Sequence, residues 1–572
     1  MIDYKVQIAQ IIAKQEIGLT AEEIAEMIEV PTDSKNGDFA FPCFRLAKTM
    51  RKAPQMIAAD VASSIENESI FDKVEQVNAY VNMFICKDAF VRNVVSEVIS
   101  LGCGYGKSNV GEGKKVIVEF SSPNIAKPFH IGHIRSTVIG NSIYKLYDAT
   151  GYDVVRINHL GDYGTQFGKM IVAYRLWGSE EELEKNPIKS LLKYYTKFHE
   201  EAEKDPSLDD KARETFAKLE NGEPEEVELW KRFRELSLEE FSRVYKMLDI
   251  EFDSYAGESF YSDKMPAVLK ELKDKNLMHE SRGAQIVDLE DYDMPPAVIT
   301  KSDGSSLYAT RDIAAAIYRK QHYDFYKNIY VVATQQNLHF KQWKQVLALM
   351  GYAWEEDCIH VPFGLVSLEE GTMSTRKGRV VFLEDVLNKA VEKTREIISE
   401  KNTSGIDIDE ISKEVGIGAV IFQELSNNRI KDYVFSWDKI LNFDGETGPY
   451  VQYTHARASS VLRNASQQEL DRIKSCDIND FNYVTSDSAY ELTKLIYRVP
   501  GVVREAAAKY EPSILTRHLI DIAQSFNRFY HDEHILVDNE EEKVEKLALV
   551  YAAKVTIANC LAILGIKAPD KM

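Results

Sequence analysis

The stretch SSPNIAKPFHIGHIRST, residues 121–137, decides the fold class. It follows KVIVEF at 115–120, a short β-branched run typical of a buried parallel strand. Residues 121–127 predict a turn, and Pro128 suits the start of a helix that extends to about residue 150. DVVRINHL at 153–160 predicts a second strand. This order of elements predicts a βαβ unit of the doubly wound kind.

Further strands are predicted at 328–334 (NIYVVAT) and 358–363, so the parallel sheet continues after a long interruption. The intervening residues, about 175–300, are too many for a simple crossover and predict an insertion. Residues 178–230 of this insertion hold 16 acidic and 8 basic residues, an excess of eight negative charges. We interpret that stretch as a solvated helical surface.

The flanking regions differ from this α/β pattern. Residues 1–110 mix helical stretches with short strands such as 80–85, and SKNGDFAFP at 34–42 predicts a loop. A glycine-bearing linker at 102–115 indicates a domain boundary. From about 381 apolar residues recur at helical spacing, with a possible capping box at Ser488 and a possible helix stop at Gly565. We therefore predict an α+β domain (1–110), a doubly wound, Rossmann-like domain (111–380) and an all-α domain (381–572, core about 450–572).

Composition excludes several classes of protein. The 572 residues correspond to roughly four domain-sized units at ~150 residues each. With 90 acidic and 70 basic residues, the net charge of −20 argues against a generic basic nucleic-acid coat. We recognise neither a membrane-spanning apolar run nor a signal peptide, which predicts a cytoplasmic protein without a membrane partner. The six cysteines form no C-x-x-C pair, so we expect reduced thiols and no structural metal.

His130 and His133 are the strongest chemical signal. They are three residues apart, so both rings can extend from one face of the first helical turn. Gly132 between them allows a flat base to approach the backbone. Imidazole donors at a helix N-terminus suit the charge that develops on a phosphate during transfer. The alternative is a surface histidine pair beside a turn, but the strand–turn–helix context favours the phosphate site.

A second element, GTMSTRKGR at 371–379, places Arg376, Lys377 and Arg379 among small residues. Cations on such a segment can neutralise a leaving pyrophosphate without covalent chemistry. Basic loops are common and are usually only solvated surface. Together with the histidine turn, however, this one indicates nucleotide chemistry.

HIGH at 130–133 and MSTRKG at 373–378 resemble the two signature motifs of class I aminoacyl-tRNA synthetases. Further stretches narrow the resemblance to the arginyl-tRNA synthetases, and they extend in order along nearly the whole chain: GDFAFP (37–42), EFSSPNIAKPFHIGHIRST (119–137), NHLGDYGTQFG (158–168), FDSYAGESFY (252–261), SDGSSLYATRDIAAAIYR (302–319), KDYVFSWDKIL (431–441) and GPYVQYTHAR (448–457). The resemblance implies that ATP, brought with Mg²⁺, activates L-arginine as arginyl-adenylate. Arginine then passes to tRNA(Arg), with release of AMP and pyrophosphate. It also implies a monomer with an N-terminal tRNA-binding domain and a C-terminal anticodon-binding domain.

The resemblance also implies roles for individual residues. The catalytic group is His130, Gly132, His133, Lys127, Arg376 and Lys377, and the ATP-binding group is Ser122, Pro123, Phe129, Ile131, Met373 and Ser374. The arginine-binding group is Glu119, Asn124, Tyr308, Asp312 and Gln336, with Asp312 on the guanidinium; the tRNA-binding group is Tyr453, Arg457, Tyr530 and Met572. In one departure, Thr372 stands where many class I enzymes have a lysine, and we expect Lys127 to reach the ATP phosphates instead.

Three alternatives remain open from the sequence. Another class I synthetase would share HIGH, but the cysteinyl enzymes bring zinc ligands that we do not find here. A nucleotidyltransferase of the H-x-G-H type would be far shorter and would lack the helical C-terminal region. An inactive tRNA-binding paralogue is disfavoured by the intact His130, His133, Asp312 and Lys377. Arginyl enzymes resemble a small group that needs bound tRNA before the amino acid is activated, and we expect the same here.

Overall fold

The computed structural model describes residues 3–15, 17–31, 33–300, 308–368, 381–400, 407–443, 445–476, 478 and 481–572. The chain divides into two compact units. Unit 1 comprises Met1–Tyr105, Arg457–Arg498 and Asp521–Thr556, and unit 2 comprises Gly106–Ala456, Val499–Ile520 and Ile557–Met572.

Unit 2 contains the predicted parallel sheet, in the order β10-β9-β4-β5. Its strands are β4 (Lys115–Glu119), β5 (Asp153–Ile157), β9 (Lys327–Ala333) and β10 (Cys358–Phe363). The first strand of the sheet, β4, lies in the interior, so the chain passes to one side of it for β5 and to the other for β9 and β10. The carboxyl ends of β4 and β9 therefore lie side by side at the topological switch point, where doubly wound folds bind ligands.

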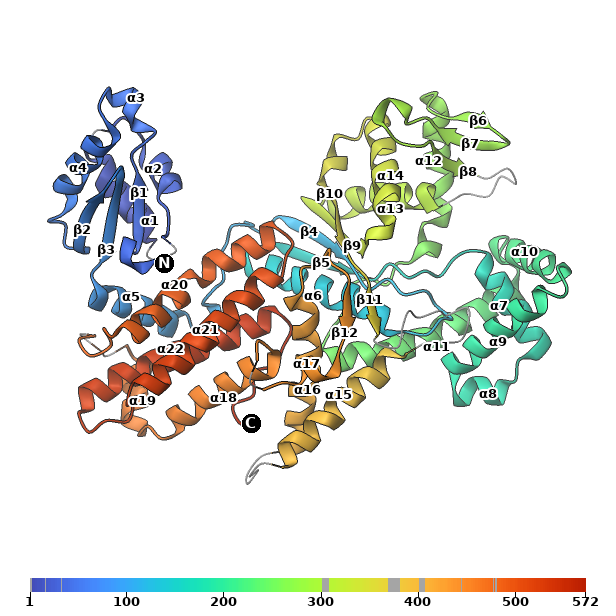
Figure 1. Cartoon of the computed structure of the whole chain (residues 1–572). Helices are drawn as coiled ribbons and strands as arrows, with labels where there is room; N and C mark the ends of the chain where they lie inside the picture. The colour runs from blue at the N-terminus through green and yellow to red at the C-terminus, as the bar shows by residue number, and fades with distance from the viewer. Residues whose placement is uncertain are drawn as a thin grey trace. The chain divides into compact units, whose positions relative to one another are not determined.

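Helices on the sheet connect these strands, as predicted. A 3₁₀ turn, η3 (Ile131–His133), leads into α6 (Ile134–Ala149) between β4 and β5. Helix α13 (Tyr308–Tyr323) precedes β9, and α14 (Asn337–Leu349) connects β9 to β10 after the turn η6 (Thr334–Gln336) (Figure 1).

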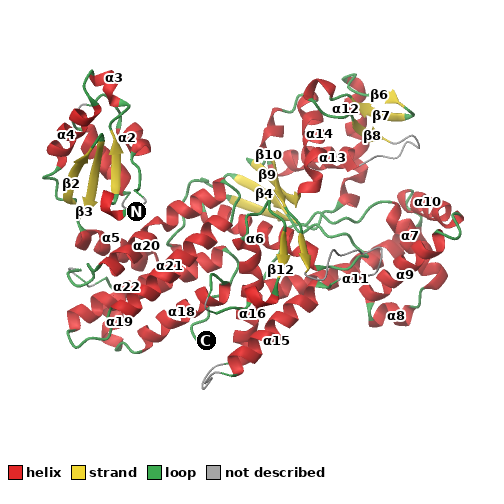
Figure 2. Cartoon of the chain, in the orientation of Figure 1, coloured by secondary structure: helices red, strands yellow, loops and turns green. Residues whose placement is uncertain are grey.

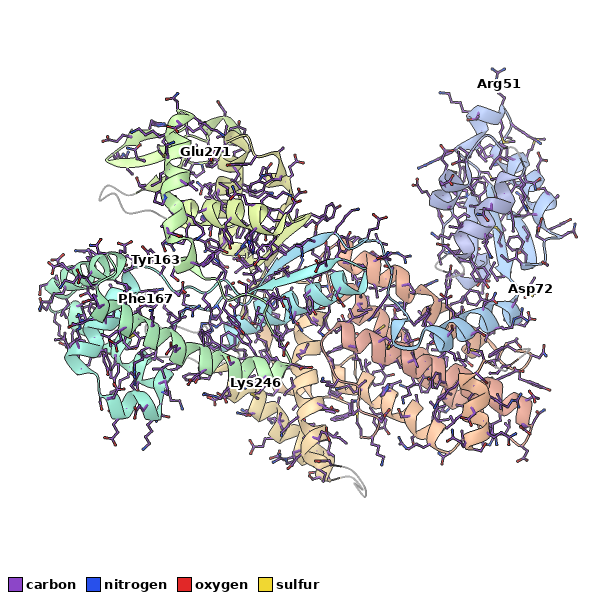
Figure 3. The ribbon with its side chains drawn as sticks, turned by 180° about the vertical axis from the view of Figure 1, so that it is seen from behind. Arg51, Asp72, Tyr163, Phe167, Lys246 and Glu271 are labelled. Carbon is purple, nitrogen blue, oxygen red and sulfur yellow. The ribbon has the colours of Figure 1, made fainter. Side chains whose placement is uncertain are left out.

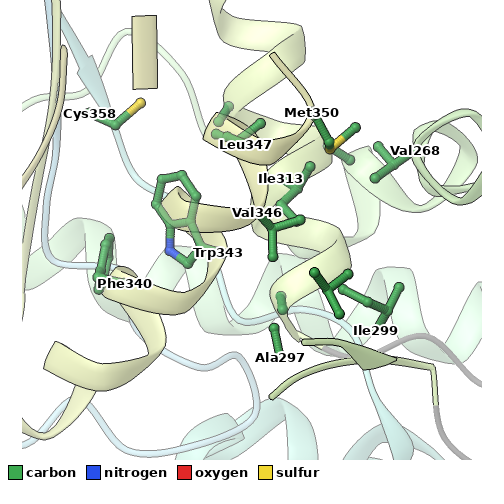
Figure 4. Close-up of a cluster of buried hydrophobic side chains, with 14 of the residues drawn as sticks. Val268, Ala297, Ile299, Ile313, Phe340, Trp343, Val346, Leu347, Met350 and Cys358 are labelled. Atoms are coloured by element: carbon green, nitrogen blue, oxygen red, sulfur yellow. The ribbon is translucent and has the colours of Figure 1, made fainter. Parts of the chain in front are cut away.

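A buried apolar cluster holds α13 and α14 in place (Figure 4). Trp343, Val346 and Leu347 of α14 and Ile313 of α13 are all 0% exposed. Full burial of such a side chain contributes about 1.5–3 kcal/mol. Both helices are thereby fixed beside β9, and with them the polar residues at their N-terminal ends.

The predicted insertion is mainly helical (Figure 2). It follows α7 (Thr165–Trp177) and contains α8 (Glu180–Lys185), α9 (Pro187–Ala202), α10 (Ser207–Glu220), α11 (Pro224–Leu248), η4 (Glu258–Lys264) and α12 (Met265–Asp274). A small antiparallel sheet, β6 (His279–Ser281), β7 (Ala284–Val287) and β8 (Ala297–Thr300), completes it.

The region after residue 381, predicted to be wholly helical, also contains a strand. The helices of this region in unit 2 include α15 (Leu383–Ser399), α16 (Ile408–Ser426), α17 (Trp437–Ile440) and the start of α18 (Gly448–Arg463). Between α16 and α17, β12 (Tyr433–Phe435) pairs in parallel with β11 (Val366–Leu368). A strand of three residues is too short to show a periodicity of its own, and its partner lies far away in the sequence.

In unit 1, residues 1–105 form the predicted α+β fold. Its antiparallel sheet has the order β1-β3-β2, with β1 (Phe39–Pro42), β2 (Phe71–Val77) and β3 (Tyr80–Ile85). Its helices are α1 (Tyr4–Ala13), α2 (Ala21–Met27), α3 (Leu46–Met50), α4 (Pro54–Ile65) and α5 (Lys87–Leu101). The prediction of a loop over 34–42 was wrong for its second half, because Phe39 and Phe41 are buried in β1.

The helical part of unit 1 consists of α19 (Gln467–Lys474) and of parts of α18, α20 (Asp487–Ala508), α21 (Ser513–Asp532) and α22 (Glu540–Ile563). The cap of α20 is Ser486, whose Oγ accepts from the Ala489 N–H, and not Ser488. The helix stop at Gly565 is confirmed by its φ of 77°. By length and composition α22 could cross a membrane, but 67% of its most apolar window is buried inside the structure.

Candidate active site

The histidine turn is built from hydrogen bonds between its own residues. His130 caps η3: its Nδ1 accepts from the Gly132 N–H at 3.0 Å, and its own N–H donates to His133 Nδ1 at 3.2 Å. The ring centroids are 4.1 Å apart, so the two rings share one face as predicted. Pro128, expected at the first helical position, instead stands two residues before the cap, because the His130 side chain takes the capping role.

Both imidazoles are neutral at pH 7. Burial, with the charge of Lys127, lowers the pKa of His130 to about 4. Burial, with His130 and Lys127, lowers the pKa of His133 to about 3. Because Nδ1 of His130 accepts a backbone hydrogen bond, the proton of this ring is on Nε2. His130 is therefore a neutral donor, and net positive charge must come from other side chains.

Main-chain bonds join the histidine turn to the residues that follow the second signature motif. Ile131 N–H donates to Val381 O at 3.1 Å, and Leu383 N–H donates to Phe129 O at 2.9 Å. Phe129 is itself buried, with its ring centroid 5.1 Å from that of His133. Met373, Ser374, Arg376 and Lys377 lie outside the described residues. Residues 381–383, which follow this motif, are nevertheless bonded to the chain beside His130.

The turn between β4 and the histidines has an unusual backbone. Ser121, Ser122 and Ala126 have φ values of 69°, 46° and 58°, a region that L-residues rarely adopt. Buried hydrogen bonds hold the turn in this conformation, including Ser121 Oγ to the Tyr245 hydroxyl at 2.7 Å. Strained backbone of this kind clusters at functional sites.

Asn124 is fixed against the loop after β5. It forms an isolated bridge with Gly161, whose N–H donates to Pro123 O at 3.1 Å. A Cβ on Gly161 would lie 2.3 Å from Asn124 Oδ1, so only glycine permits this approach.

Two predicted arginine-binding carboxylates already have cationic partners. Glu119, the last residue of β4, lies 2.6 Å from Nη1 of Arg319, and the Arg319 side chain is fully buried. Asp312 Oδ2 lies 2.5 Å from His339 Nε2. Burial opposes the protonation of His339, but the bond to Asp312 raises its pKa overall. Both partners were missed in the sequence.

The other predicted arginine-binding residues lie around the same sheet edge. Gln336 ends η6 immediately after β9 and is exposed. Tyr308 is the first residue of α13, which puts it one turn before Asp312, but its side chain lies outside the described residues. The structure thus brings Glu119, Asn124, Asp312 and Gln336 to the carboxyl ends of β4 and β9.

A third carboxylate, Glu258, was also missed. Its Oε2 is 3.0 Å from Nη1 of Arg311. Burial raises the pKa of Glu258 to about 7; Arg311 opposes this rise, while Asp312 and Asp162 add to it. Glu258 and Asp162 belong to two motif stretches already recognised, FDSYAGESFY and NHLGDYGTQFG, and carboxylates there were the available signal.

Aromatic rings line this group of charges. The Arg311 guanidinium carbon is 4.9 Å from the ring centroid of Tyr163, which lies beside Phe167 of α7 (Figure 3). Asp162 accepts from Ser259 N–H at 2.8 Å and from Arg234 Nε at 3.2 Å. These bonds fix the loop after β5 to the start of η4 and to α11.

Lys127 lies close to the histidine turn. Its Nζ is 5.9 Å from the ring centroid of Tyr195, on α9. Its charge contributes to the lowered pKa of both His130 and His133. The ammonium group is therefore near enough to act on the same ligand as the two imidazoles.

The predicted tRNA-binding residues fall in two places. Arg457 lies over the ring of Tyr530 at 5.3 Å and donates to Asn527 Oδ1, and Tyr530 is 42% exposed. Tyr453 stands one helical turn before Arg457 on α18 and is half-buried. Met572 packs against the cluster of Ile398, Ile411 and Val415 in unit 2.

Within the residues that the structure describes, no group of three or more His, Cys, Asp or Glu side chains is placed to hold a metal ion.

Comparisons with known families identify all three regions. Residues 94–437 match the family described as tRNA synthetases class I (R), catalytic domain. Residues 451–572 match the DALR anticodon binding domain, and residues 3–85 match the arginyl tRNA synthetase N terminal domain.

Full-length relatives agree with these matches. The chain is 56% identical to an arginine–tRNA ligase of Halothermothrix orenii and 58% identical to one of Clostridioides difficile, each over 100% of both chains. In fold it is similar to Thermus thermophilus arginyl-tRNA synthetase, with a TM-score of 0.80 and 24% identity over 100% of both chains. A Plasmodium falciparum arginyl-tRNA synthetase gives a TM-score of 0.79 at 25% identity, over 99% of this chain and 98% of that one. The chain therefore belongs to the arginyl-tRNA synthetases, class I enzymes that use ATP to charge tRNA with arginine.

Proposed function

We propose that both steps of arginine transfer take place at the carboxyl ends of β4 and β9. A carboxylate oxygen of L-arginine attacks the α-phosphorus of ATP, which arrives with Mg²⁺, and pyrophosphate leaves. The 2′-hydroxyl of the terminal tRNA adenosine then attacks the carbonyl carbon of arginyl-adenylate, and AMP leaves. The observation that carries this proposal is that the two half-buried imidazoles follow β4, whose last residue is Glu119, while Glu119, Asp312 and Glu258 each lie beside a cationic side chain near the same sheet edge.

In this proposal His130 and His133 act as neutral hydrogen-bond donors to the phosphates. Their lowered pKa values support this assignment, because a neutral ring is not repelled by nearby cations. Lys127, Arg376 and Lys377 supply the positive charge that stabilises the transition state. Gly132 leaves room for the adenine, while Ser122, Pro123, Phe129, Ile131, Met373 and Ser374 complete the ATP site.

We assign the amino-acid pocket to Glu119, Asn124, Tyr308, Asp312 and Gln336. Asp312 receives the guanidinium, which needs a carboxylate because it is always charged and only donates hydrogen bonds. Glu119 and Asn124 hold the amino-acid end of the substrate. The rigid placement of both beside the strained turn supports this role.

We assign anticodon contacts to Tyr453, Arg457, Tyr530 and Met572. The exposed Tyr530 ring with Arg457 over it supports base stacking, because unpaired bases bind to an aromatic face flanked by a cation. Domain limits near residues 110 and 380 stay a prediction. So do a monomeric state, a cytoplasmic location and the absence of a membrane partner.

The first test is a charging assay with purified tRNA and each of the twenty amino acids. We expect only arginine to be incorporated. We also expect ATP–pyrophosphate exchange to require tRNA(Arg). Incorporation of another amino acid, or substantial arginine-dependent exchange without tRNA, would contradict the respective expectation.

Lys127→Met should lower kcat/KM for ATP in the charging reaction by about 10²-fold, because it removes one cation from the phosphates. The KM for arginine should change little. Lys211→Met, which removes an exposed lysine of α10, is the matched control and should behave as the unmodified enzyme. Equal losses of kcat/KM for ATP in both variants would contradict a role of Lys127 in binding the ATP phosphates.

Glu258→Gln should remove a pH dependence of stability. The pKa of folded Glu258, about 7, is above its ordinary value of 4.5, so its stabilising proton is fully bound below pH 4.5 and is lost as the pH rises through 7. Thermal unfolding followed by circular dichroism should show the unmodified protein losing about 1–3 kcal/mol relative to the variant between pH 5 and 8.5. Substitution of the exposed Glu280 by Gln should leave the pH profile unchanged, and parallel profiles for Glu258→Gln would overturn the prediction.

Tyr530→Leu should raise the KM for tRNA(Arg) about tenfold, since stacking of one base contributes about 1–3 kcal/mol. The KM for arginine should stay constant. Tyr483, at 44% exposed, provides an equally accessible tyrosine in the same unit, and Tyr483→Leu serves as the control. If the KM for tRNA(Arg) is the same in both variants, the anticodon does not bind at Tyr530.

A further inference from the structure

The pair formed by His339 and Asp312 occupies the carboxylate that the proposed function assigns to the substrate guanidinium. His339 is the third residue of α14, and Asp312 is the fifth residue of α13. Their side chains are 25% and 30% exposed, so a ligand can reach the pair from solvent. Arginine therefore meets an Asp312 that already has a histidine partner.

The three carboxylates of the site differ in the kind of cation beside them. Glu119 pairs with Arg319 and Glu258 with Arg311, and a guanidinium never loses its proton in a protein. Asp312 alone among these three pairs with an imidazole, which can lose its charge near neutral pH. Of the three, Asp312 is thus the carboxylate whose partner can be neutralised when a second cation arrives.

The surroundings of His339 favour its neutral form once Asp312 is engaged elsewhere. The ring lies in the first turn of α14, where the positive end of the helix dipole disfavours a cation. Burial acts in the same direction, and only the bond and charge of Asp312 oppose it. The charge of His339 contributes to the lowered pKa of His360 of β10, so the two rings lie near each other. Two cations on one half-buried carboxylate repel each other, and the histidine is the one that can give up its proton.

We propose that His339 is a positioning residue that holds Asp312 in its arginine-free conformation and yields its proton when the substrate guanidinium binds. This inference rests on the proposed assignment of Asp312. The exchange balances: protonated His339 beside ionised Asp312, plus arginine, gives the arginine–Asp312 pair, neutral His339 and one proton released to solvent. Binding of arginine is consequently weakened by acid, because protonated His339 and the substrate guanidinium compete for the same carboxylate.

Two other groups that face Asp312 also titrate and must be separated from His339. Glu258 is influenced by the charge of Asp312 and would also tend to lose a proton when a cation enters the pocket. His159 is half-buried, and burial lowers its pKa, which favours its neutral form. The experiment therefore compares a His339 variant with a Glu258 variant.

Isothermal titration of the full-length enzyme with L-arginine at pH 6.5, in two buffers of different ionisation enthalpy, counts released protons. The unmodified enzyme should release more than Glu258→Gln, and Glu258→Gln should still release at least about half a proton. His339→Gln keeps a hydrogen-bond donor for Asp312 but has no titratable proton at this position. It should therefore lose the part of the proton release that comes from His339. In the charging assay, the KM for arginine should rise at least threefold from pH 8 to 6.5 in Glu258→Gln. In the double variant that combines Glu258→Gln with His339→Gln, it should rise less than 1.5-fold.

Proton release unchanged by His339→Gln would overturn the proposal. If His339→Gln does not fold, arginine binding to Glu258→Gln without any proton release overturns it equally well. Failure of the proposed function gives a different result: either arginine is not charged at all, or Asp312→Asn leaves the KM for arginine unchanged. A structural role alone for His339 would raise the KM values for ATP and arginine together and would not change the proton count.

Discussion

The site depends on one topological constraint, the adjacency of β4 and β9 in a parallel sheet. Because the chain leaves β4 in one direction and later returns to the other side of it, the loops after the two strands open at the same edge. One loop leads to Asn124 and the histidine turn, and the other leads to Gln336 and His339. Neither half would suffice alone, since one carries the proposed phosphate donors and the other part of the proposed amino-acid pocket.

Charge balance is the second organising principle of this edge. Bringing three carboxylates together would be costly without compensation, and burial raises the pKa of Glu258 although the charge of Arg311 opposes the rise. Arg319, Arg311 and His339 each lie against one carboxylate. Arg319 is further enclosed by the rings of Tyr261 and Tyr330, at 5.7 and 5.5 Å from their centroids. Each of the three carboxylates therefore has a cationic side chain beside it before the proposed cationic substrate enters.

Local features of the sequence were predicted well, and long-range pairings were not. The βαβ unit and the shared face of His130 and His133 follow from strand and helix patterns within the continuous segment 115–157, and the structure confirms both. The pairing of Glu119 with Arg319 joins a strand to a distant helix, and that of Asp312 with His339 joins two helices. Periodicity does not encode such tertiary contacts. The same reason explains β12, whose identity as a strand depends on pairing with β11. At the start of α20, two nearby serines both fit a capping pattern, and only the backbone shows that Ser486 takes the role.

The main-chain bonds between the histidine turn and residues 381–383 bear on how this enzyme can vary during evolution. Ile131 and Leu383 make these bonds through backbone atoms, so many side chains are compatible with them. The number of residues between the two anchored ends is more constrained than the identity of the side chains. Leu368 is held in β11 and Val381 at the histidine turn, which leaves the twelve positions 369–380 to connect them. Substitutions at Ile131 and Leu383 should therefore accumulate freely among descendants. Insertions and deletions between Lys377 and Val381 should be rare, because each would change the number of residues between the histidine turn and the basic residues that we propose act with it.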